Sequence, residues 1–346
     1  YLKYVNHSSL EDKERNYMNM EKECHQLAPK IQKEQLGPRH VDVATSNNNL
    51  DLEYRGRGDL EKAKEYYQLA LKIQKERLGP SHVDAARSYY NLGKVYHHTG
   101  DLEKAKEYHQ LALEIQKEQL SPNHVDIARS YSNLGLVYYR TDELEKAREY
   151  HQLALKIQKK QLGPNHVDIA RSYSNLGLVY YRTGDLEKAR EYHQLALKIQ
   201  KEQLGPDHVD VARSYSNLGL VYSDTSDKEQ AKEYYELALK IQKEQLGPND
   251  INVARSYSNL GTVYGKTGDL KKAKEYLQLA LRIQNEQFGP KHVNSHTSGS
   301  PSLFDVGQRG IKPSNVGDEM LPYVLQDMQP LTLPISDDND ELPIYC

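Results

Sequence analysis

Residues 166–207 read HVDIARSYSNLGLVYYRTGDLEKAREYHQLALKIQKEQLGPD, and this 42-residue pattern decides the fold because it recurs along most of the chain. Copies begin at His40, His82, His124, His166, His208 and Asp250, the first and last being weaker, and a stub begins at His292. The copies that begin at His124 and His166 differ at only four positions. This similarity indicates recent duplication, and it leaves no copy that has diverged into a unique active site.

Each copy has the pattern of two helices. In the quoted copy, apolar side chains at spacings of three and four predict a first helix over Val167–Arg182. Strong helix formers predict a second helix over Leu186–Leu204. Between the two, Gly184 suits a left-handed turn and Asp185 is a good N-cap. Gly205-Pro206 ends the second helix, because Gly supplies the terminal turn and Pro cannot continue the helix.

The second helix is expected to pack on two sides, because it carries two adjacent apolar stripes. One stripe holds Leu186, Ala189, His193 and Ala196, and the other holds Tyr192, Leu195 and Ile199. A single helix pair cannot bury its outer stripe alone, so stacking on neighbouring pairs is required.

A glycine recurs inside the first helix, at Gly93, Gly135, Gly177, Gly219 and Gly261. Glycine in a helix interior costs about 1 kcal/mol relative to Ala, so this position needs a reason. We expect close contact there, with the backbone of the partner helix passing where a Cβ would clash and with Ala189 and Ala196 forming the small surface opposite. Each copy is then a tight antiparallel helix pair.

The copies resemble the tetratricopeptide repeat, and the matching positions in the quoted copy are Tyr173, Leu176, Gly177, Tyr180, Gly184-Asp185, Ala189 and Ala196-Leu197. Tyr replaces the usual Trp, and a longer second helix replaces the usual closing Pro. The 42-residue period with a Leu-Gly-Pro-x-His junction is similar to the repeats of kinesin light chains and of nephrocystin-type arrays attached to signalling NTPases. The resemblance covers about 40–292 and implies an all-α, right-handed superhelical solenoid of antiparallel helix pairs.

The chain divides into three parts: a degenerate half repeat over 1–39, six units over 40–81, 82–123, 124–165, 166–207, 208–249 and 250–291, and an acidic tail over 293–346. Pro29 should kink a helix over 22–36, and Asn47, Asp51 and Glu53 replace Tyr, Gly and Val of the pattern, so we expect a loosened N-terminal end. The tail is rich in Pro, Gly, Ser and Asp without periodicity, which predicts disorder. We expect no capping helix after the last helix, about 270–288, so its apolar face stays open.

No residues support catalysis or cofactor binding. Most of the fourteen histidines belong to the repeat, and copies one repeat apart lie too far from each other to share one metal ion. Gly265-Lys266-Thr267 resembles the end of a phosphate loop, but only three residues separate Gly261 from Gly265 and a helix end replaces the required strand. No Ser/His/Asp set or carboxylate pair stands apart from the repeat, so we expect no enzyme, no metal and no cofactor.

Composition excludes further classes of protein. The tail carries a net charge of −6 and the rest of the chain +3, which argues against a duplex-DNA binder. Tyrosines such as Tyr173 and Tyr180 hold core positions, so they are not stacking platforms for single-stranded nucleic acid. No apolar run is long enough to span a membrane. Two cysteines, Cys24 and Cys346, fit a reducing compartment and a cytoplasmic location. The chain begins without Met, which indicates a fragment.

The side of the first helix opposite the core is the candidate functional face. Stacking turns its side chains into parallel rows, and in the resembled family this side is the concave groove that binds peptides. Candidate peptide-binding residues are Arg129, Asn133, Leu136, Tyr139, Arg140, Arg171, Asn175, Leu178, Tyr181, Arg182, Arg213, Asn217, Leu220, Arg255 and Asn259. The alternative is an ordinary solvated helix face. Arginines without a balancing acid before Asp224 favour the groove, where Asn can pair with peptide amides and Arg with carboxylates.

These residues predict a scaffold for acidic linear motifs. Exposed ion pairs give roughly 0.2–1 kcal/mol each, whereas micromolar binding needs about 8 kcal/mol, so an apolar anchor must supply most of the affinity. The protein is either an adaptor, as the kinesin light chain resemblance implies, or the regulatory arm of a larger NTPase. The acidic and apolar segment 331–344 could occupy the groove intramolecularly or cover the last helix.

Overall fold

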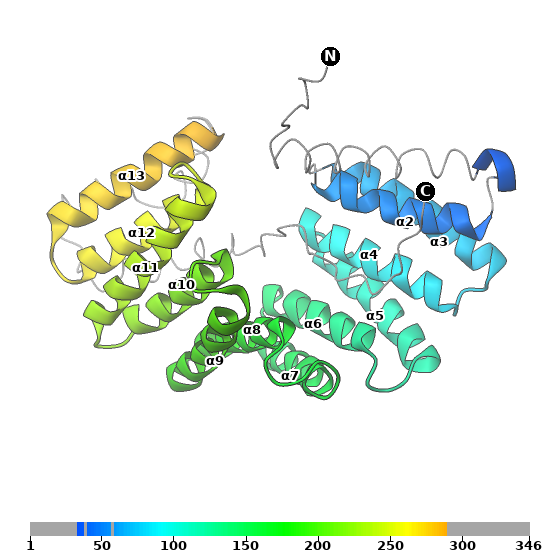
Figure 1. Cartoon of the computed structure of the whole chain (residues 1–346), viewed down its shortest axis with the longest axis horizontal. Coiled ribbons are helices and arrows are strands. Elements are labelled where there is room, and N and C mark those ends of the chain that lie inside the picture. Colours follow the sequence, from blue (N-terminus) through cyan, green and yellow to red (C-terminus); the bar gives the residue numbers. More distant parts are fainter. Residues whose placement is uncertain (1–32, 38–39, 57–58, 289–346) are drawn as a thin grey trace, which may run out of the picture. The chain divides into compact units, whose positions relative to one another are not determined.

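The computed structural model describes residues 33–37, 40–56 and 59–288, with side chains over 33–37, 40–48 and 59–287. This part of the chain is helical and contains no strand. First helices are α2 (Val41–Gly56), α4 (Val83–Thr99), α6 (Val125–Arg140), α8 (Val167–Arg182), α10 (Val209–Ser223) and α12 (Ile251–Lys266). Second helices are α3 (Leu60–Arg77), α5 (Leu102–Gln119), α7 (Leu144–Gln161), α9 (Leu186–Leu204), α11 (Lys228–Leu246) and α13 (Leu270–Phe288). Figure 1 shows the pairs following one another along the chain, as predicted.

The ends of the helices are set by local capping. Asp185 accepts a hydrogen bond from the Lys188 backbone N–H at 3.1 Å, which confirms its predicted N-cap role. Gly184, the residue before Asp185, has φ +81°, so the predicted left-handed turn is confirmed as well. The junction histidine has a role that sequence reasoning missed, because Nδ1 of His166 accepts from the Asp168 N–H at 3.1 Å and caps α8.

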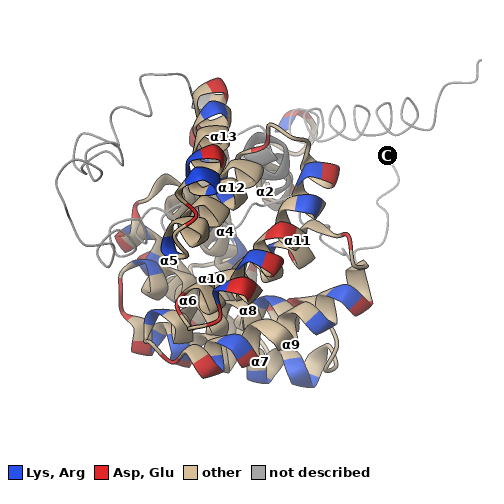
Figure 2. Cartoon of the chain, turned by 90° about the vertical axis from the view of Figure 1, so that its left-hand side faces the viewer, with Lys and Arg blue, Asp and Glu red and all other residues tan. Residues whose placement is uncertain are grey.

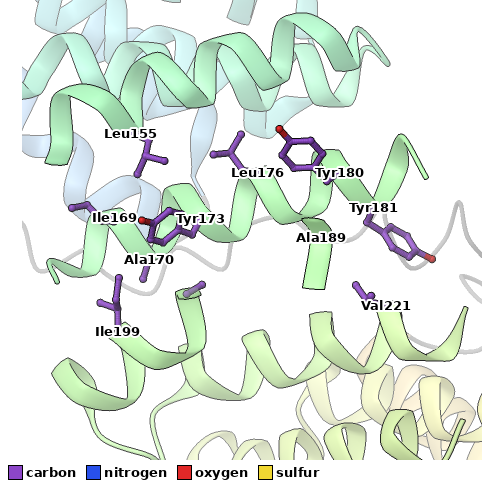
Figure 3. Packing of buried hydrophobic residues seen from close by; sticks show 11 residues of the cluster. Leu155, Ile169, Ala170, Tyr173, Leu176, Tyr180, Tyr181, Ala189, Ile199 and Val221 are labelled. Carbon is purple, nitrogen blue, oxygen red and sulfur yellow. The ribbon is translucent and has the colours of Figure 1, made fainter. Parts of the chain in front are cut away.

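Contacts divide the described part into two compact units, unit 1 up to Glu143 and unit 2 from Leu144, and each is described by itself. Inside unit 2, one cluster joins Leu155 of α7, Ile169, Leu176 and Tyr180 of α8, and Ala189 of α9 (Figure 3). A second helix therefore packs against both its own first helix and the next one, as its two stripes predict. The stripe assignment was wrong at Leu195, which is 43% exposed, and Leu197 is buried instead.

A buried hydrogen bond joins each second helix to the first helix of the next copy. In unit 2 the pairs are Gln158–Ser172 at 2.6 Å, Gln200–Ser214 at 2.5 Å and Gln242–Ser256 at 2.6 Å. In unit 1 the same bond joins Gln74 to Ser88 and Gln116 to Ser130. The Ser hydroxyl donates to the Gln carbonyl oxygen in each case, so every described stacking contact repeats one buried polar pair.

The recurring glycine lies in close contact, but the contacting group differs from the prediction. A Cβ on Gly177 would lie 2.6 Å from ring atoms of His193, a side chain and not the backbone of α9. The same position faces His109 at Gly93, Tyr235 at Gly219 and Leu277 at Gly261. The absent Cβ therefore leaves space for one large side chain of the second helix.

The two ends of the array are described to different extents. The predicted loosening of the N-terminal end depends on Pro29, Asp51 and Glu53, whose side chains lie outside the described residues, and the predicted tail lies outside them too. At the other end α13 matches the predicted bounds. Leu281 of α13 is 43% exposed, which agrees with an open apolar face.

Candidate functional site

The arginines near the start of the first helices lie at the surface, each beside an oxygen acceptor three residues earlier. Arg171 donates to the Asp168 carboxylate at 3.0 Å, and Arg129 to Asp126 at 3.2 Å. Arg213 pairs with Asp210 in the same way. Arg255, whose copy has Asn252 in place of Asp, donates to that amide oxygen at 3.2 Å. The expectation of arginines without balancing acid was therefore wrong, because the Asp lies one helix turn before the Arg.

The asparagine row lies deeper than the arginine row. Asn217 is 4% exposed and Asn259 is 8% exposed, whereas Asn133 and Asn175 are half-buried. The Nδ2 of Asn133 is buried without a hydrogen-bond partner. A buried amide that lacks a partner is costly, so this donor is an unsatisfied polar group beneath the surface of the face.

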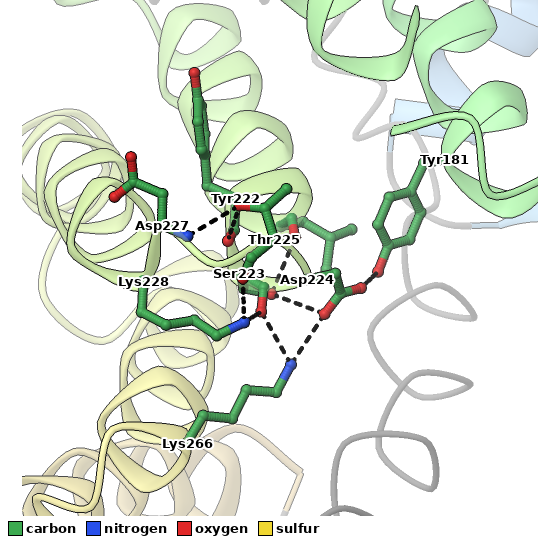
Figure 4. A network of polar contacts seen from close by, with 9 residues as sticks. Tyr181, Tyr222, Ser223, Asp224, Thr225, Asp227, Lys228 and Lys266 are labelled. Carbon is green, nitrogen blue, oxygen red and sulfur yellow. Dashed lines mark hydrogen bonds and ion pairs between the residues drawn. The ribbon is translucent and has the colours of Figure 1, made fainter. Parts of the chain in front are cut away.

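Apolar side chains on this face are only partly covered by the fold. Leu136, Leu178 and Leu220 are half-buried, and so is Tyr139. Tyr181, in contrast, is 6% exposed, and its hydroxyl donates to the Asp224 carboxylate at 2.5 Å (Figure 4). The leucines are thus the available apolar lining, and Tyr181 mainly joins α8 to α10.

The last turn of the first helices carries bonds between successive copies. Arg140 donates to the backbone carbonyl of His97 at 2.7 Å, and burial lowers the pKa of the Arg140 guanidinium. Lys266 donates to the carbonyl of Ser223 at 3.4 Å and to the Asp224 carboxylate at 3.0 Å. A cation at the C-terminal end of the preceding first helix also meets the negative end of its dipole. Arg182, at the same position of α8, is half-buried.

The copy over 208–249 departs from the others in this region (Figure 4). Ser226 replaces the turn glycine and Lys228 replaces the leucine that begins the other second helices of unit 2. Lys228 Nζ donates to the carbonyls of Ser223 and Thr225, at the end of α10. The lysine therefore satisfies helix-end carbonyls without a left-handed glycine.

Groups that could support other chemistry are absent or buried in the described part. No cluster of three or more His, Cys, Asp or Glu side chains that could hold a metal occurs among the described residues. His193 is fully buried with neither ring nitrogen bonded, and burial lowers its pKa to about 3, so it is neutral. Gly265-Lys266-Thr267 lies at the end of α12, the context predicted for it. None of the described helices is both long and apolar enough to cross a membrane.

Comparisons with known proteins agree with this architecture. A family model of the tetratricopeptide repeat matches residues 51–118, 84–160, 126–202, 168–244 and 229–286. No curated protein sequence matches the chain. BtubC (BKLC) from P. vanneervenii is 26% identical over 69% of this chain and 92% of its own, with a TM-score of 0.54.

Two further solved structures resemble the chain in fold. The nearly identical TPR-like repeats of a Podosopora anserina protein, assigned as a kinesin light chain, are 24% identical over 60% of this chain and 98% of their own, with a TM-score of 0.51. The apo form of RapI is 19% identical over 78% of this chain and 94% of its own, with a TM-score of 0.61.

Proposed function

The chain belongs to the tetratricopeptide repeat family, and on this premise we propose that it is a non-catalytic scaffold that binds acidic linear peptides on the side of its first helices opposite the core. The repeat fold is that of a protein-interaction scaffold, and the family is generally non-catalytic. The proposed site consists of the arginine, asparagine and leucine rows defined above.

The half-buried leucines on this face carry the proposal. Leu178 of α8 and Leu220 of α10 occupy the same position of successive copies on the side that packs against no helix of the pair. Leu220 also packs against the core cluster that contains Tyr181, so Leu178 is the better candidate to hold an apolar ligand. On α8, Leu178 lies between Arg171 and Arg182, so a ligand anchored on Leu178 would have a cation on either side.

The chemistry of the ligand follows from these neighbours. Arg171 already forms an ion pair with Asp168. A carboxylate of the peptide would therefore share the Arg171 guanidinium with Asp168. Exposed pairs of this kind contribute roughly 0.2–1 kcal/mol each, so they order the peptide along the row. A leucine-sized or aromatic side chain on Leu178 or Leu220 would supply most of the affinity. The preferred ligand is a peptide with several acids around one large apolar residue.

Two biological settings fit this activity. In one, the protein is an adaptor that holds a partner by such a motif; in the other, the repeats form the regulatory arm of a larger signalling NTPase. Residues 331–344 of the chain itself combine apolar residues with acids and match the proposed ligand chemistry. A cytoplasmic location suits either setting.

The experiment measures binding of fluorescent synthetic peptides, rich in Asp and carrying one Leu, Tyr or Trp, by anisotropy. Arg140→Glu with Arg182→Glu should abolish binding, and Leu178→Ser should weaken it about tenfold. The matched control is Arg148→Glu with Arg190→Glu, which makes the same charge change on the second helices α7 and α9. Unchanged affinity after the first double reversal, or equal loss in the control, would reject the first-helix face.

A further inference from the structure

The last second helix, α13, leaves open the side that earlier second helices bury. The leucine at one repeat position is 5% exposed at Leu113, 8% at Leu155 and 9% at Leu197, and half-buried at Leu71 and Leu239, but it is 43% exposed at Leu281. The residue that would cover it belongs to a following first helix, and α13 is the last helix of the described part. We name the end face as Lys274, Leu277, Leu281 and Gln284, the α13 positions whose counterparts contact the next copy.

The polar positions of the end face are likewise open. Gln200 and Gln242 each accept a hydrogen bond from a serine of the next first helix. Gln284 holds the same position, and none of the described residues bonds to its side chain. Lys232 lies 4.7 Å from the ring centre of Tyr264 in the next copy, whereas Lys274 at the same position has no following copy among the described residues.

The charge of the end face departs from the repeat. Four second helices pair a Glu with a cation three residues later, as in Glu61–Lys64, Glu145–Arg148, Glu187–Arg190 and Glu229–Lys232. In α13 the Glu has become Lys271, so Lys271 and Lys274 form a like-charge pair near the start of the helix, where the helix dipole also disfavours cations. No ion pair forms to either lysine within the described part of the chain. An anionic occupant would offset the repulsion between these two lysines.

The repeat itself does not supply that occupant. Continuing the 42-residue register past α13 places His296 where the preceding copy has Ala254, which is 0% exposed, and Pro301 where it has Asn259, in the middle of α12 and 8% exposed. A histidine does not fit the space of a fully buried alanine, and proline removes a helical hydrogen bond. A seventh first helix is therefore a poor match for the end face.

We propose that the end face binds residues 331–344 of the same chain, LTLPISDDNDELPI. This segment combines Leu331, Leu333 and Ile335 with four acids over 337–341, and so matches both the exposed leucine and the unpaired lysines. About 50 residues separate Phe288 from the acids and span up to roughly 160 Å when extended, so reach does not limit the contact. Attachment to the chain also raises the effective concentration of the segment to the millimolar range. This proposal does not depend on peptide binding by the first-helix face.

The first test uses the full chain and a carbodiimide, which joins an amine and a carboxylate that touch. Mass spectrometry should find Lys271 or Lys274 joined to an acid within 337–341 in the monomer. Lys266 and Asp224, 3.0 Å apart, provide an internal positive control. Formation of the control cross-link without the tail cross-link would refute the proposal, and so would tail cross-links found only in a dimer band, which would assign the site to a second copy.

The second test measures anisotropy of a labelled peptide 329–346 added to the full chain whose own acids at 337, 338, 340 and 341 are changed to Asn or Gln. Lys271→Glu, which restores the pair of the earlier copies, should weaken binding about tenfold, as should Leu281→Ser. Matched controls are Lys198→Glu, an equal charge change on α9, and Leu237→Ser, a leucine of α11 that is also 43% exposed. Neither control should change the affinity more than twofold.

The outcomes separate this proposal from the proposed function. If Arg140→Glu with Arg182→Glu abolishes binding of the tail peptide and Lys271→Glu does not, the tail occupies the first-helix face, which refutes the end-face proposal and supports the peptide groove. If the peptide does not bind saturably, the end-face proposal fails, while the groove is still judged by its own peptides.

Discussion

Buried imidazoles should make the stability of this protein sensitive to mild acid. His109, His151 and His193 are at most 1% exposed, and burial lowers the pKa of each to about 3. His97 is 8% exposed, and burial, with Arg140 beside it, also lowers its pKa to about 3. An unfolded histidine has a pKa near 6.5, so between pH 6.5 and 3 the unfolded chain binds protons that the folded chain excludes.

The size of the effect follows from this difference. Stability is unaffected by these groups above pH 6.5 and falls as the pH drops from 6.5 toward 3. Each buried histidine contributes up to about 1.4 kcal/mol per pH unit in this window. Four of them give a slope of about 5 kcal/mol per unit, which is comparable to the whole stability of a small domain.

The measurement is urea unfolding followed by circular dichroism at pH 7.5, 6 and 5, above the range in which carboxylates titrate. The comparison is a variant with His109→Leu, His151→Leu and His193→Leu, which copies the natural Leu277 opposite Gly261. Of the four buried histidines, this variant keeps only His97. Its loss of unfolding free energy between pH 6 and 5 should therefore be about a quarter of the loss in the unchanged protein. Equal losses in both proteins would show that the buried rings are not the source of acid sensitivity.

Three further changes test individual contacts by thermal or urea unfolding. Gly177→Ala should destabilise the protein, because the new Cβ would lie 2.6 Å from a fully buried ring, whereas Gly265→Ala meets nothing closer than 3.9 Å and should stabilise α12 by roughly 0.5–1 kcal/mol. Gln200→Ala leaves the hydroxyl of Ser214 buried without its acceptor and should cost about 1–3 kcal/mol. Asp142→Gly should add about 0.5–1 kcal/mol, because Asp142 has φ +63° at a turn where other copies have glycine.

Each of these changes has a control or a contrary outcome. Gln284→Ala removes the same side chain at the open end and should cost far less than Gln200→Ala, so similar losses would show that the bond to serine contributes little. If Gly177→Ala is as stable as the unchanged protein, the His193 ring can move and the contact is not tight. A loss of stability in Asp142→Gly would show that the aspartate makes a compensating contact.

The fold was predictable from the sequence because its determinants are local and repeated. Asp185, Gly184 and the Gly-Pro junction each act within a few residues of the helix end they fix, so the bounds of α8 and α9 followed from them. The contact at Gly177 was predicted, but spacing along one helix does not tell which atom of the other helix fills the space. The sequence placed His193 on the correct side of the second helix, but it did not show that the His193 ring fills this space.

The candidate face was harder to predict because its polar contacts join residues far apart in sequence. The bonds from Arg140 to His97 and from Tyr181 to Asp224 each connect positions 43 residues apart, an offset that depends on how successive copies are rotated. The pairing of Arg171 with Asp168 could have been found, since a separation of three residues on a helix brings side chains together. The recurrence of Gln and Ser on otherwise apolar sides was a further signal of a buried polar pair.

The buried pair of Gln and Ser also bears on how the gene can change. Each bond joins two residues that are 14 positions apart in successive copies, and the same pair recurs at every described junction. The bond therefore does not depend on which two copies are neighbours. Recombination that inserts or removes one whole period of codons leaves every glutamine facing a serine, whereas a slip by any other number of codons breaks the match at the joint. The array can therefore lengthen or shorten between generations without any compensating substitution.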